Sequence, residues 1–489
     1  MSDSPDYQQL FQQQQQQNQQ LLEQNKQLQR LIEKLQEQIE QLLRARFGKK
    51  SERQPKPKVP RNKLPMLPAE SSVQSRALPA NLARVDIVYE VPESEQYCPQ
   101  CEKPLAPIKP ITTEQYAYRP GSLYIKKHIR QRYACRGCKQ TLITATLPNQ
   151  AIDKGIADSS LLAQVLVDKY DDHLPLYRQE RRWLRLGVAM PRQTLCDWAM
   201  ASSVWLGYLV IEMKKDILAA GKIHSDDTVF PILAPGKTHQ GRLWVYVGGG
   251  GNAPPVAVVY EYTPTRASTG PTQFLKGYRG YLQADAYAGY DALYQSGDIV
   301  EVACLAHARR KFVDAYESSS GSDAQAKSLI AIEFIGQLYH IESLTRTMTA
   351  QQRYYYRRHY AKPLLKQLHH WLKRIQPLTY PKLLLGKAIA YTLNHWRAFC
   401  HYCRSGILDI DNNVAERAIK PFVIGRKNYL FAGSHQGAKA AANIYSIIET
   451  CKMWNVNTYH YLCDVLARLP NTQQLDIRQL LPYHWKPSQ

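Results

Sequence analysis

Three acidic segments of the sequence contain side chains that could bind divalent metal ions together. They are HSDDTVF with Asp226 and Asp227, LQADAYAGY with Asp285, and DIDNNVAERAIK with Glu416. Mg²⁺ prefers oxygen ligands, and carboxylates are its usual ligands in proteins. Two such ions held about 3.5–4 Å apart can contact both the attacking and the leaving oxygen at a phosphorus. The chemistry that these residues predict is therefore metal-assisted transfer or hydrolysis at a phosphodiester.

The residues around these acids predict the elements that would position them. The pattern indicates three successive strands at residues 221–233, 241–249 and 254–264, and a fourth strand at 280–285 that ends at Asp285. A fifth strand runs into a basic helix within residues 298–312, and residues 325–405 form a helical block. Three antiparallel strands, followed by shorter strands that alternate with helices, is the order of a ribonuclease-H-like fold. In that fold the carboxylates lie on the first strand, at the end of the fourth strand and on a later helix, which is the order of the three acidic segments.

Each acid also has a structural interpretation. Asp226 and Asp227 could lie at a strand end, and Asp285 could cap a helix that begins after Ala286. Asn413 and Glu416 fit a capping box, with the amide at the N-cap and the glutamate three residues later. The order of the acids along the chain favours the metal site over three unrelated structural roles.

The whole chain predicts a multidomain α+β protein. Its predicted parts are a disordered glutamine-rich tail (1–20), a leucine-zipper coiled coil (21–47), a basic proline-rich linker (48–80), a zinc-binding β module (81–150), a helical, helix-turn-helix-like DNA-binding domain (151–220), a ribonuclease-H-like α/β catalytic core (221–317 and 408–455) with a helical insertion (318–407), and a C-terminal tail (456–489).

Two N-terminal patterns predict a dimer and a zinc site. Leucines recur every seven residues, with isoleucine and one asparagine between them, at Leu21, Leu28, Leu35 and Leu42 and at Asn25, Ile32 and Ile39. This pattern favours a parallel two-stranded coiled coil, and the alternative is a single amphipathic helix packed on its own protein. Two CxxC pairs predict a closed, structural zinc site at Cys98, Cys101, Cys135 and Cys138. The pair Cys400 and Cys403 lies in a helical stretch, where packing is the simpler interpretation.

The formal net charge of +22 predicts an anionic partner, either nucleic acid or an anionic membrane. The sequence has no uninterrupted apolar run long enough for a membrane span and no secretory signal, so we expect no membrane helix and a reducing cytoplasm. Basic residues interleaved with tyrosines in the zinc module could contact a DNA backbone, namely Lys126, Lys127, Arg130 and Arg132. Gly187 and Pro191 predict the turn of a helix-turn-helix, whose second helix would present Arg192 and Gln193.

The sequence resembles the large transposase of the insertion-sequence-66 family of bacterial mobile elements from about residue 21 to the C-terminus. The segments that carry the resemblance are HSDDTVFPIL, GRLWVYV, LQADAYAGYDALY, VACLAHARRKF, DIDNNVAERAIKPFVIGRKNYLFAGSHQGAKAAANIYSIIET and LLPYHWKP. The resemblance implies a DDE transposase whose catalytic triad is Asp226, Asp285 and Glu416, with Asp227 as an open alternative for the first position.

The activity implied is binding to terminal inverted repeats, DNA cleavage that frees a 3′-hydroxyl, and attack of that hydroxyl on double-stranded target DNA, with Mg²⁺ or Mn²⁺ as cofactor. His307 would orient water or a phosphate, or else be a structural histidine. Basic residues near the triad would contact phosphates, or else form a solvated surface, namely Arg309, Arg310, Lys311, Arg417, Lys420, Arg426 and Lys427. Small companion proteins and an oligomer larger than a dimer are further expectations. The alternatives are a DNA-binding regulator and a structure-selective nuclease.

Overall fold

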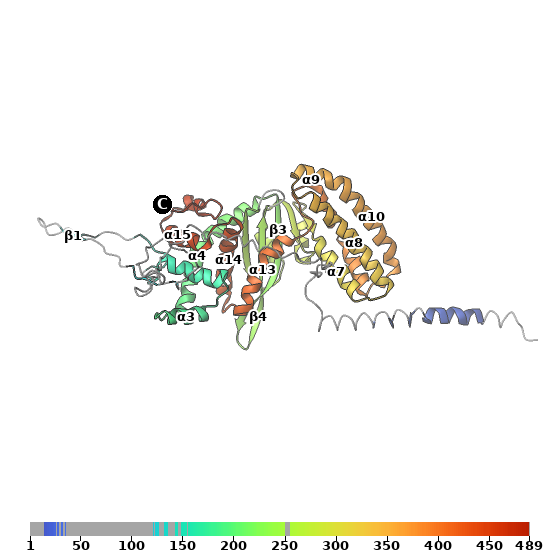
Figure 1. Ribbon diagram of the computed structural model, residues 1–489, viewed down its shortest axis with the longest axis horizontal. Helices are drawn as coiled ribbons and strands as arrows, with labels where there is room; N and C mark the ends of the chain where they lie inside the picture. The colour runs from blue at the N-terminus through green and yellow to red at the C-terminus, as the bar shows by residue number, and fades with distance from the viewer. Residues whose placement is uncertain are drawn as a thin grey trace, which may run out of the picture. The chain divides into compact units, whose positions relative to one another are not determined.

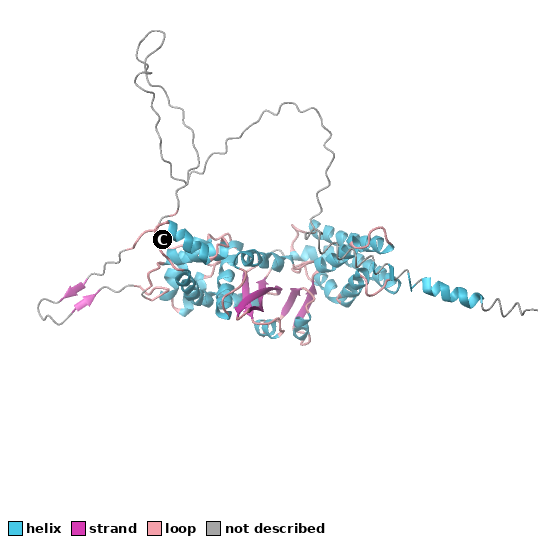
Figure 2. Cartoon of the chain, turned by 90° about the horizontal axis from the view of Figure 1, so that it is seen from below, coloured by secondary structure: helices cyan, strands magenta, loops and turns pink. Residues whose placement is uncertain are grey.

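The computed structural model describes part of the chain. The described residues are 14–25, 27–28, 31–32, 35, 121, 123–126, 132–134, 142–144, 148–153, 155–249 and 255–488. The chain divides into two units, Met1–Lys49 with His128–Gln489, and Lys50–Lys127. The fold below is that of the first unit (Figure 2). All four cysteines of the predicted zinc site, with Lys127 and Arg130, lie outside the described residues.

The first unit contains a mixed sheet of five strands (Figure 1). They are β3 (Lys222–Ala234), β4 (Lys237–Gly248), β5 (Ala257–Thr263), β6 (Gly280–Ala284) and β7 (Ile299–Ala303), in the order β5-β4-β3-β6-β7. Strand β4 pairs antiparallel with both β3 and β5. Strand β6 pairs parallel with both β3 and β7. The predicted order of three antiparallel strands and two shorter later strands is confirmed.

The middle of β4 is an apolar run because the sheet is covered on both faces. Leu243, Trp244, Val245, Tyr246 and Val247 are all fully buried, so residues of both strand faces are removed from water. Helices α4 (Arg192–Leu218) and α14 (His435–Met453) pack against β5, and α13 (Asn413–Tyr429) packs against β3 and β4. The sheet thus sets the position of α13, the helix that carries the third acid.

Side chains from helices occupy both edges of the sheet. On β5 the backbone N–H of Val258 donates to Thr450 Oγ1 at 3.1 Å, and the N–H of Tyr260 donates to Ser446 Oγ at 2.8 Å. On β7 the carbonyl of Glu301 is 2.6 Å from Nδ1 of His401. These contacts satisfy polar backbone groups that an edge strand otherwise exposes.

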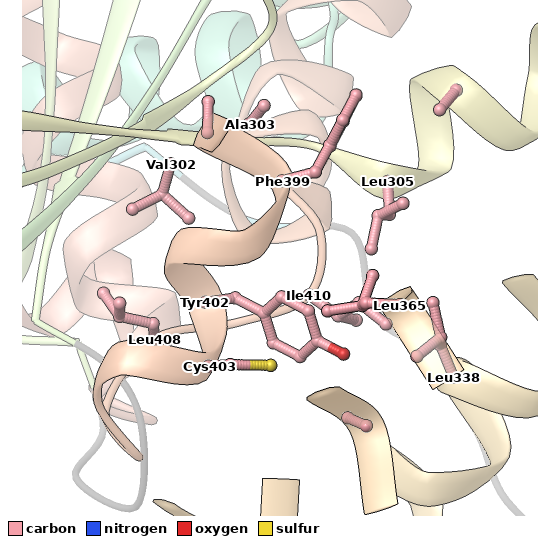
Figure 3. Close-up of a cluster of buried hydrophobic side chains, with 13 residues drawn as sticks. Val302, Ala303, Leu305, Leu338, Leu365, Phe399, Tyr402, Cys403, Leu408 and Ile410 are labelled. Atoms are coloured by element: carbon pink, nitrogen blue, oxygen red, sulfur yellow. The ribbon is translucent and has the colours of Figure 1, made fainter. Parts of the chain in front are cut away.

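Residues 305–404 form a helical body beside β7. Its elements are α7 (Leu305–Glu317), α8 (Asp323–Leu344), α9 (Ala350–Tyr356), the π-helical turn η4 (Arg357–Ala361), α10 (Lys362–Ile375), α11 (Leu384–Asn394), α12 (Trp396–Cys400) and η6 (His401–Arg404). The predicted helical block is confirmed. A buried cluster joins this body to the sheet, with Val302 from β7 and Leu305, Leu365 and Phe399 from the helical body (Figure 3).

Cys403 lies in the same cluster beside Tyr402 (Figure 3). Burial raises the pKa of its thiol to about 12, so the side chain is a neutral, apolar group. The interpretation of Cys400 and Cys403 as packing residues is confirmed for Cys403, which is fully buried.

The predicted helix-turn-helix segment forms two helices. Helix α3 (Leu176–Arg185) is followed by Gly187 with φ of +82°, and α4 begins after Pro191. Among the described residues, α4 is the one helix that is long and apolar enough to cross a membrane by length and composition alone, which is weak evidence for a membrane span. A buried core helix passes the same test, and Leu206 and Met213 on α4 are fully buried.

The N-terminal segment also differs from the expectation for residues 1–20. Residues 14–25 are helical, so the predicted disordered tail was wrong for residues 14–20. The described residues of the predicted heptad seam, Leu21, Leu28, Ile32 and Leu35, each have about half of their side-chain surface exposed, between 50 and 55%.

Candidate active site

Asp226 and Asp285 are brought together by the register of two parallel strands. Lys222 to His224 of β3 pair with Tyr281 to Gln283 of β6. The same register continued by two residues puts Asp226 beside Asp285, the first residue after β6. Strand β3 continues to Ala234, so the interpretation of the Asp226-Asp227 pair as a strand end was wrong.

The structure separates the roles of Asp226 and Asp227, which alternate between the two faces of β3. Asp227 is buried, and its carboxylate accepts from Arg242 at 3.0 Å and from Arg266 at 2.8 Å. These two guanidinium groups compensate its charge. Asp227 therefore serves as a structural anion between β3, β4 and the segment after β5.

Asp226 lies near other acidic groups instead. Burial, as the largest cause, and the charges of Asp285, Asp227 and Glu416 together raise the pKa of Asp226 to about 7, although a hydrogen bond from the backbone N–H of Asp227 lowers it. Asp285 and Glu416 are thus close enough to Asp226 for their charges to affect its ionisation. A site of this kind favours a cation.

Asp285 lies in the loop that follows β6. Burial raises its pKa, whereas the nearby His307 and Arg266 lower it. The next helical turn, η3 (Ala288–Tyr290), has Tyr287 as its N-cap and no side-chain cap, so the interpretation of Asp285 as a helix cap was wrong.

Glu416 lies in the first turn of α13, which packs beside β3 (Figure 1). The N-cap is Asn412, one residue earlier than a capping box with Asn413 requires, and no side-chain capping bond is present, so that interpretation was wrong. Among the described residues Oε1 of Glu416 is buried and has no hydrogen-bond partner. Its carboxylate is thus available for a ligand in the site.

The other acids of the DIDNN segment fasten the start of α13 to the sheet. Asp409 accepts from Nζ of Lys222 at 2.5 Å and lies 3.0 Å from Nε2 of His224. Gln283 on β6 donates to the carbonyls of Asp409 and Asp411. Lys222, His224 and Gln283 are almost completely buried, so this network lies inside the protein.

Asn412 connects the start of α13 to β3 and to Cys304, the residue that follows β7. Its Nδ2 donates to the carbonyl of Ser225 at 2.8 Å, its Oδ1 is 2.9 Å from Nδ1 of His224, and its backbone N–H donates to Sγ of Cys304 at 3.1 Å. The sequence analysis did not predict the roles of His224, Gln283 and Cys304, whose only sequence signal is a polar side chain within an apolar strand or at its end.

Cys304, His307 and Glu416 form a compact group in which the potential ligand atoms all lie within 4.8 Å of one another. Burial raises the pKa of the Cys304 thiol to about 12, and its sulfur already accepts a backbone N–H. Hard cations prefer oxygen to sulfur ligands. We therefore interpret Cys304 as a residue that positions α13, and the carboxylates as the metal-binding groups.

His307 in the first turn of α7 faces Glu416. Its Nε2 is 3.8 Å from Oε1 of Glu416. Burial lowers the pKa of His307, although the charge of Glu416 opposes this effect, so the imidazole is neutral near pH 7. Nδ1 is buried and has no hydrogen-bond partner within the described part of the chain.

The basic residues predicted to contact phosphates lie in different environments. Arg310, Lys311, Arg417, Lys420 and Lys427 are exposed, as are Lys126, Arg192 and Gln193, and Arg309 is half-buried. Nη2 of Arg310 is 3.9 Å from Glu416, close to the carboxylates. Arg426 donates to the carbonyl of Val229 on β3, so its guanidinium is partly engaged within the fold. The backbone of Arg132 lies in the short strand β1 (Arg132–Ala134).

Acidic side chains from β3, from the loop after β6 and from the start of α13, within a chain of net charge +22, are typical of an enzyme that modifies nucleic acid. Comparison with protein families specifies the kind. Residues 154–440 match the family described as "Transposase IS66 family", residues 446–483 match "IS66 C-terminal element", and residues 95–139 match "zinc-finger binding domain of transposase IS66". The chain belongs to the IS66 transposase family, and the zinc-finger match supports structural zinc.

Similar proteins occur in Sinorhizobium fredii (strain NBRC 101917 / NGR234). The uncharacterized protein y4jD is 33% identical over 426 residues, which cover 84% of this chain and 82% of y4jD. The uncharacterized protein y4hP is 30% identical over 424 residues, which cover 83% of this chain and 76% of y4hP. The uncharacterized protein y4qI is 32% identical over 423 residues, which cover 83% of this chain and 77% of y4qI.

Proposed function

We propose that this protein binds the terminal inverted repeats of a bacterial insertion sequence and catalyses DNA cleavage and strand transfer. The catalytic core is a ribonuclease-H-like domain, and its triad is Asp226, Asp285 and Glu416. The observation that carries the proposal is the parallel register of β3 and β6, which continued by two residues sets Asp226 beside Asp285, together with the nearby charge of Glu416, which helps to raise the pKa of Asp226. Compensation of Asp227 by two arginines supports Asp226 as the first member of the triad.

The three carboxylates fit Mg²⁺ or Mn²⁺. They offer oxygen ligands only, and one oxygen of Glu416 has no hydrogen-bond partner among the described residues. When bound, the metal ions would activate the attacking oxygen and stabilise the leaving oxygen at the phosphorus.

Other residues of the chain would hold the DNA and the attacking group. The neutral imidazole of His307 can donate or accept one hydrogen bond at the site, which suits a water molecule or a 3′-hydroxyl. Arg310, which is exposed beside Glu416, is placed to contact a phosphate of the scissile strand. Asn412 and Cys304 act indirectly, because they fix the start of the helix that presents Glu416.

The remaining parts of the proposal concern assembly. The N-terminal heptads would form a dimer or a larger oligomer, and the zinc module and the start of α4 would contact duplex DNA. Small companion proteins of the same element are possible additional partners by family resemblance. The anionic partner that the positive net charge predicts is DNA rather than an anionic membrane, because several exposed cations flank the carboxylates. The cytoplasm of a bacterium is the compartment that contains this substrate.

The proposal is tested with a labelled duplex that carries the element's terminal repeat, in the presence of Mg²⁺ or Mn²⁺. The wild type is expected to nick the repeat and join it to target DNA. Glu416→Gln is expected to bind the duplex normally and to reduce both reactions by at least about 10³-fold, as expected for the loss of a group that acts in the transition state.

Equal activity of the wild type and Glu416→Gln would contradict the assignment of the triad. An assay that supplies precleaved element ends distinguishes a transposase from a nuclease and from a DNA-binding regulator. Cleavage without joining of precleaved ends would indicate a nuclease, and normal binding without either reaction in the wild type would favour a DNA-binding regulator.

A further inference from the structure

The helical body has a strongly asymmetric charge. Between Glu342 and Asp409 the sequence contains twelve lysines and arginines and no aspartate or glutamate. In the described structure all of these cations except Arg353 and Arg357 are exposed, and none of the exposed ones forms an ion pair. A surface with this charge has no internal partner and attracts an anionic one.

Many of these cations lie on one continuous helical run. Helix α9, the π-helical turn η4 and α10 follow one another without interruption from Ala350 to Ile375. Leu365, Leu368 and Leu372 on the inner side of this run are buried. The outer face carries two successive shallow hollows. Together they extend along about 33 Å of helix at 1.5 Å per residue.

The first hollow, of about 420 Å³, is lined mainly by Tyr355, Tyr356, His359 and Tyr360. More than half of the side-chain surface of Tyr355 and of Tyr360 is exposed, 53 and 56%, and the rings of Tyr356 and Tyr360 lie 4.4 Å apart. Large aromatic side chains are seldom exposed as a group unless they contact a partner. Their flat faces suit stacking with unpaired bases.

The second hollow, of about 460 Å³, is lined by Lys366, His370, Trp371 and Arg374. Lys366, His370 and Arg374 follow one another at intervals of four residues, and Trp371 is next to His370, so all four lie on the same side of α10. Cations beside an aromatic platform are the combination that binds single-stranded nucleic acid, with phosphates on the cations and bases on the rings. Paired bases inside a duplex do not expose their faces to such rings.

The outer face is held rigidly by the buried side of η4. The guanidinium of Arg357 is fully buried, donates to both carboxylate oxygens of Glu342, and donates to the carbonyls of Tyr402 and Ser405. A π-helical turn within an α-helix is frequently associated with a functional site. Here it contributes His359 and Tyr360 to the first hollow and is followed directly by the helix that carries the second hollow, and the contacts of Arg357 fix its inner side.

We infer that the outer face of the 350–375 helical run binds single-stranded DNA, with the tyrosines of the first hollow stacked on bases and Lys366 and Arg374 on phosphates. This inference rests on the proposed function for the source of the strand, which is DNA unpaired at or beside a cleaved element end. It adds to that function a surface outside the carboxylate site.

The test measures binding by fluorescence anisotropy with full-length protein that carries Glu416→Gln, so that no DNA is cleaved. The probes are a labelled single-stranded oligonucleotide and the blunt duplex of the same sequence. Tyr355→Ala with Tyr360→Ala is expected to weaken binding of the single strand by at least about tenfold and to leave duplex binding within about twofold. Lys366→Gln with Arg374→Gln is expected to weaken single-strand binding and to lower its salt slope by about 1 to 2.

The matched control is Lys237→Gln with Lys276→Gln, which removes two exposed charges elsewhere on the same unit and is expected to change single-strand binding by less than about twofold. The inference is overturned if the tyrosine variant binds the single strand normally, if it loses single strand and duplex equally, or if the control matches the lysine–arginine variant. A change in oligomer mass in the tyrosine variant would also overturn it, because the face would then bind a second copy. Failure of strand transfer in the wild type leaves this binding readout unaffected, so the two proposals are tested separately.

Discussion

The adjacent residues Asp226 and Asp227 on β3 differ in the charges that surround them. Asp227 is buried between two arginines, whereas Asp226 is surrounded by other carboxylates, and burial together with their repulsion raises its pKa to about 7. The sequence predicted the acidic pair but left open which member belongs to the site. The answer depends on Arg242 and Arg266, which reach Asp227 from β4 and from the segment after β5, and no pattern within HSDDTVF contains that information.

This difference gives a prediction for Asp226→Asn. Because the folded state binds a proton at Asp226 that the unfolded state has lost, the metal-free wild type is expected to lose stability as the pH rises from about 4 to about 7. Asp226→Asn is expected to remove this loss and to be more stable than the wild type above pH 7, by roughly 2 kcal/mol. It should also be inactive in cleavage.

Thermal unfolding at pH 5 and pH 8.5 without added divalent metal measures the effect. Asp227→Asn is the matched comparison, and it should destabilise the protein at both pH values because Arg242 and Arg266 lose a buried partner. If Asp226→Asn were the less stable of the two at pH 8.5, the assignment of the charges on β3 would be incorrect.

The start of α13 depends on a buried polar network rather than on a helix cap. The sequence predicted the helix correctly, since Asn412 and Asn413 precede an apolar-periodic segment, but it predicted a capping box that the structure lacks. The actual partners of this segment, Lys222, His224 and Gln283, lie more than 100 residues earlier in the chain. Contacts between such distant residues follow from the sheet order and cannot be inferred from local spacing.

Removing Asp409 tests this network. Although burial alone would raise it, the hydrogen bond from His224 and the charge of Lys222 hold the pKa of Asp409 below its ordinary value. Asp409→Ala leaves Lys222 buried without its anion, so we expect a loss of about 3 kcal/mol in the free energy of unfolding at pH 7. In the wild type this contribution should disappear as the pH falls below about 4.

Urea denaturation at pH 7 provides the measurement. Asp298→Ala is the control, because Asp298 forms an exposed ion pair with Arg279 at 3.4 Å and its removal should cost less than about 1 kcal/mol. Similar losses in the two variants would show that the network around Asp409 does not stabilise the fold.

At the scale of the whole molecule, the order of strands and helices was the most predictable property. The strand patterns on both sides of Asp285 and the helical periodicity after α7 predicted the succession of strands along the chain and the helical block. The DNA-binding face proposed on α9 and α10 was not predicted from the sequence. Its tyrosines and cations can be placed on one exposed face only when the leucines on the inner side are known to be buried. The same limit applies to α4, whose composition alone resembles a membrane span and whose burial assigns it to the core.

The N-terminal heptads give a prediction for assembly. The described seam residues are about half exposed in the single chain, as expected for side chains that pack against a second helix. Leu28→Lys with Leu35→Lys is expected to shift the mass measured by analytical ultracentrifugation from the dimer or a larger oligomer to the monomer. Glu23→Lys, on the outer side of the same helix, should leave the mass unchanged, and an unchanged mass in the leucine variant would contradict the coiled coil.

The closed edges of the sheet have a consequence for how many copies can gather on one DNA molecule. Thr450 and Ser446 occupy the hydrogen-bonding groups of β5, and His401 occupies the carbonyl of Glu301 on β7. Part of each edge of this five-stranded sheet is therefore already occupied, which limits the pairing of a strand from a neighbouring copy with these edges when several copies bind close together.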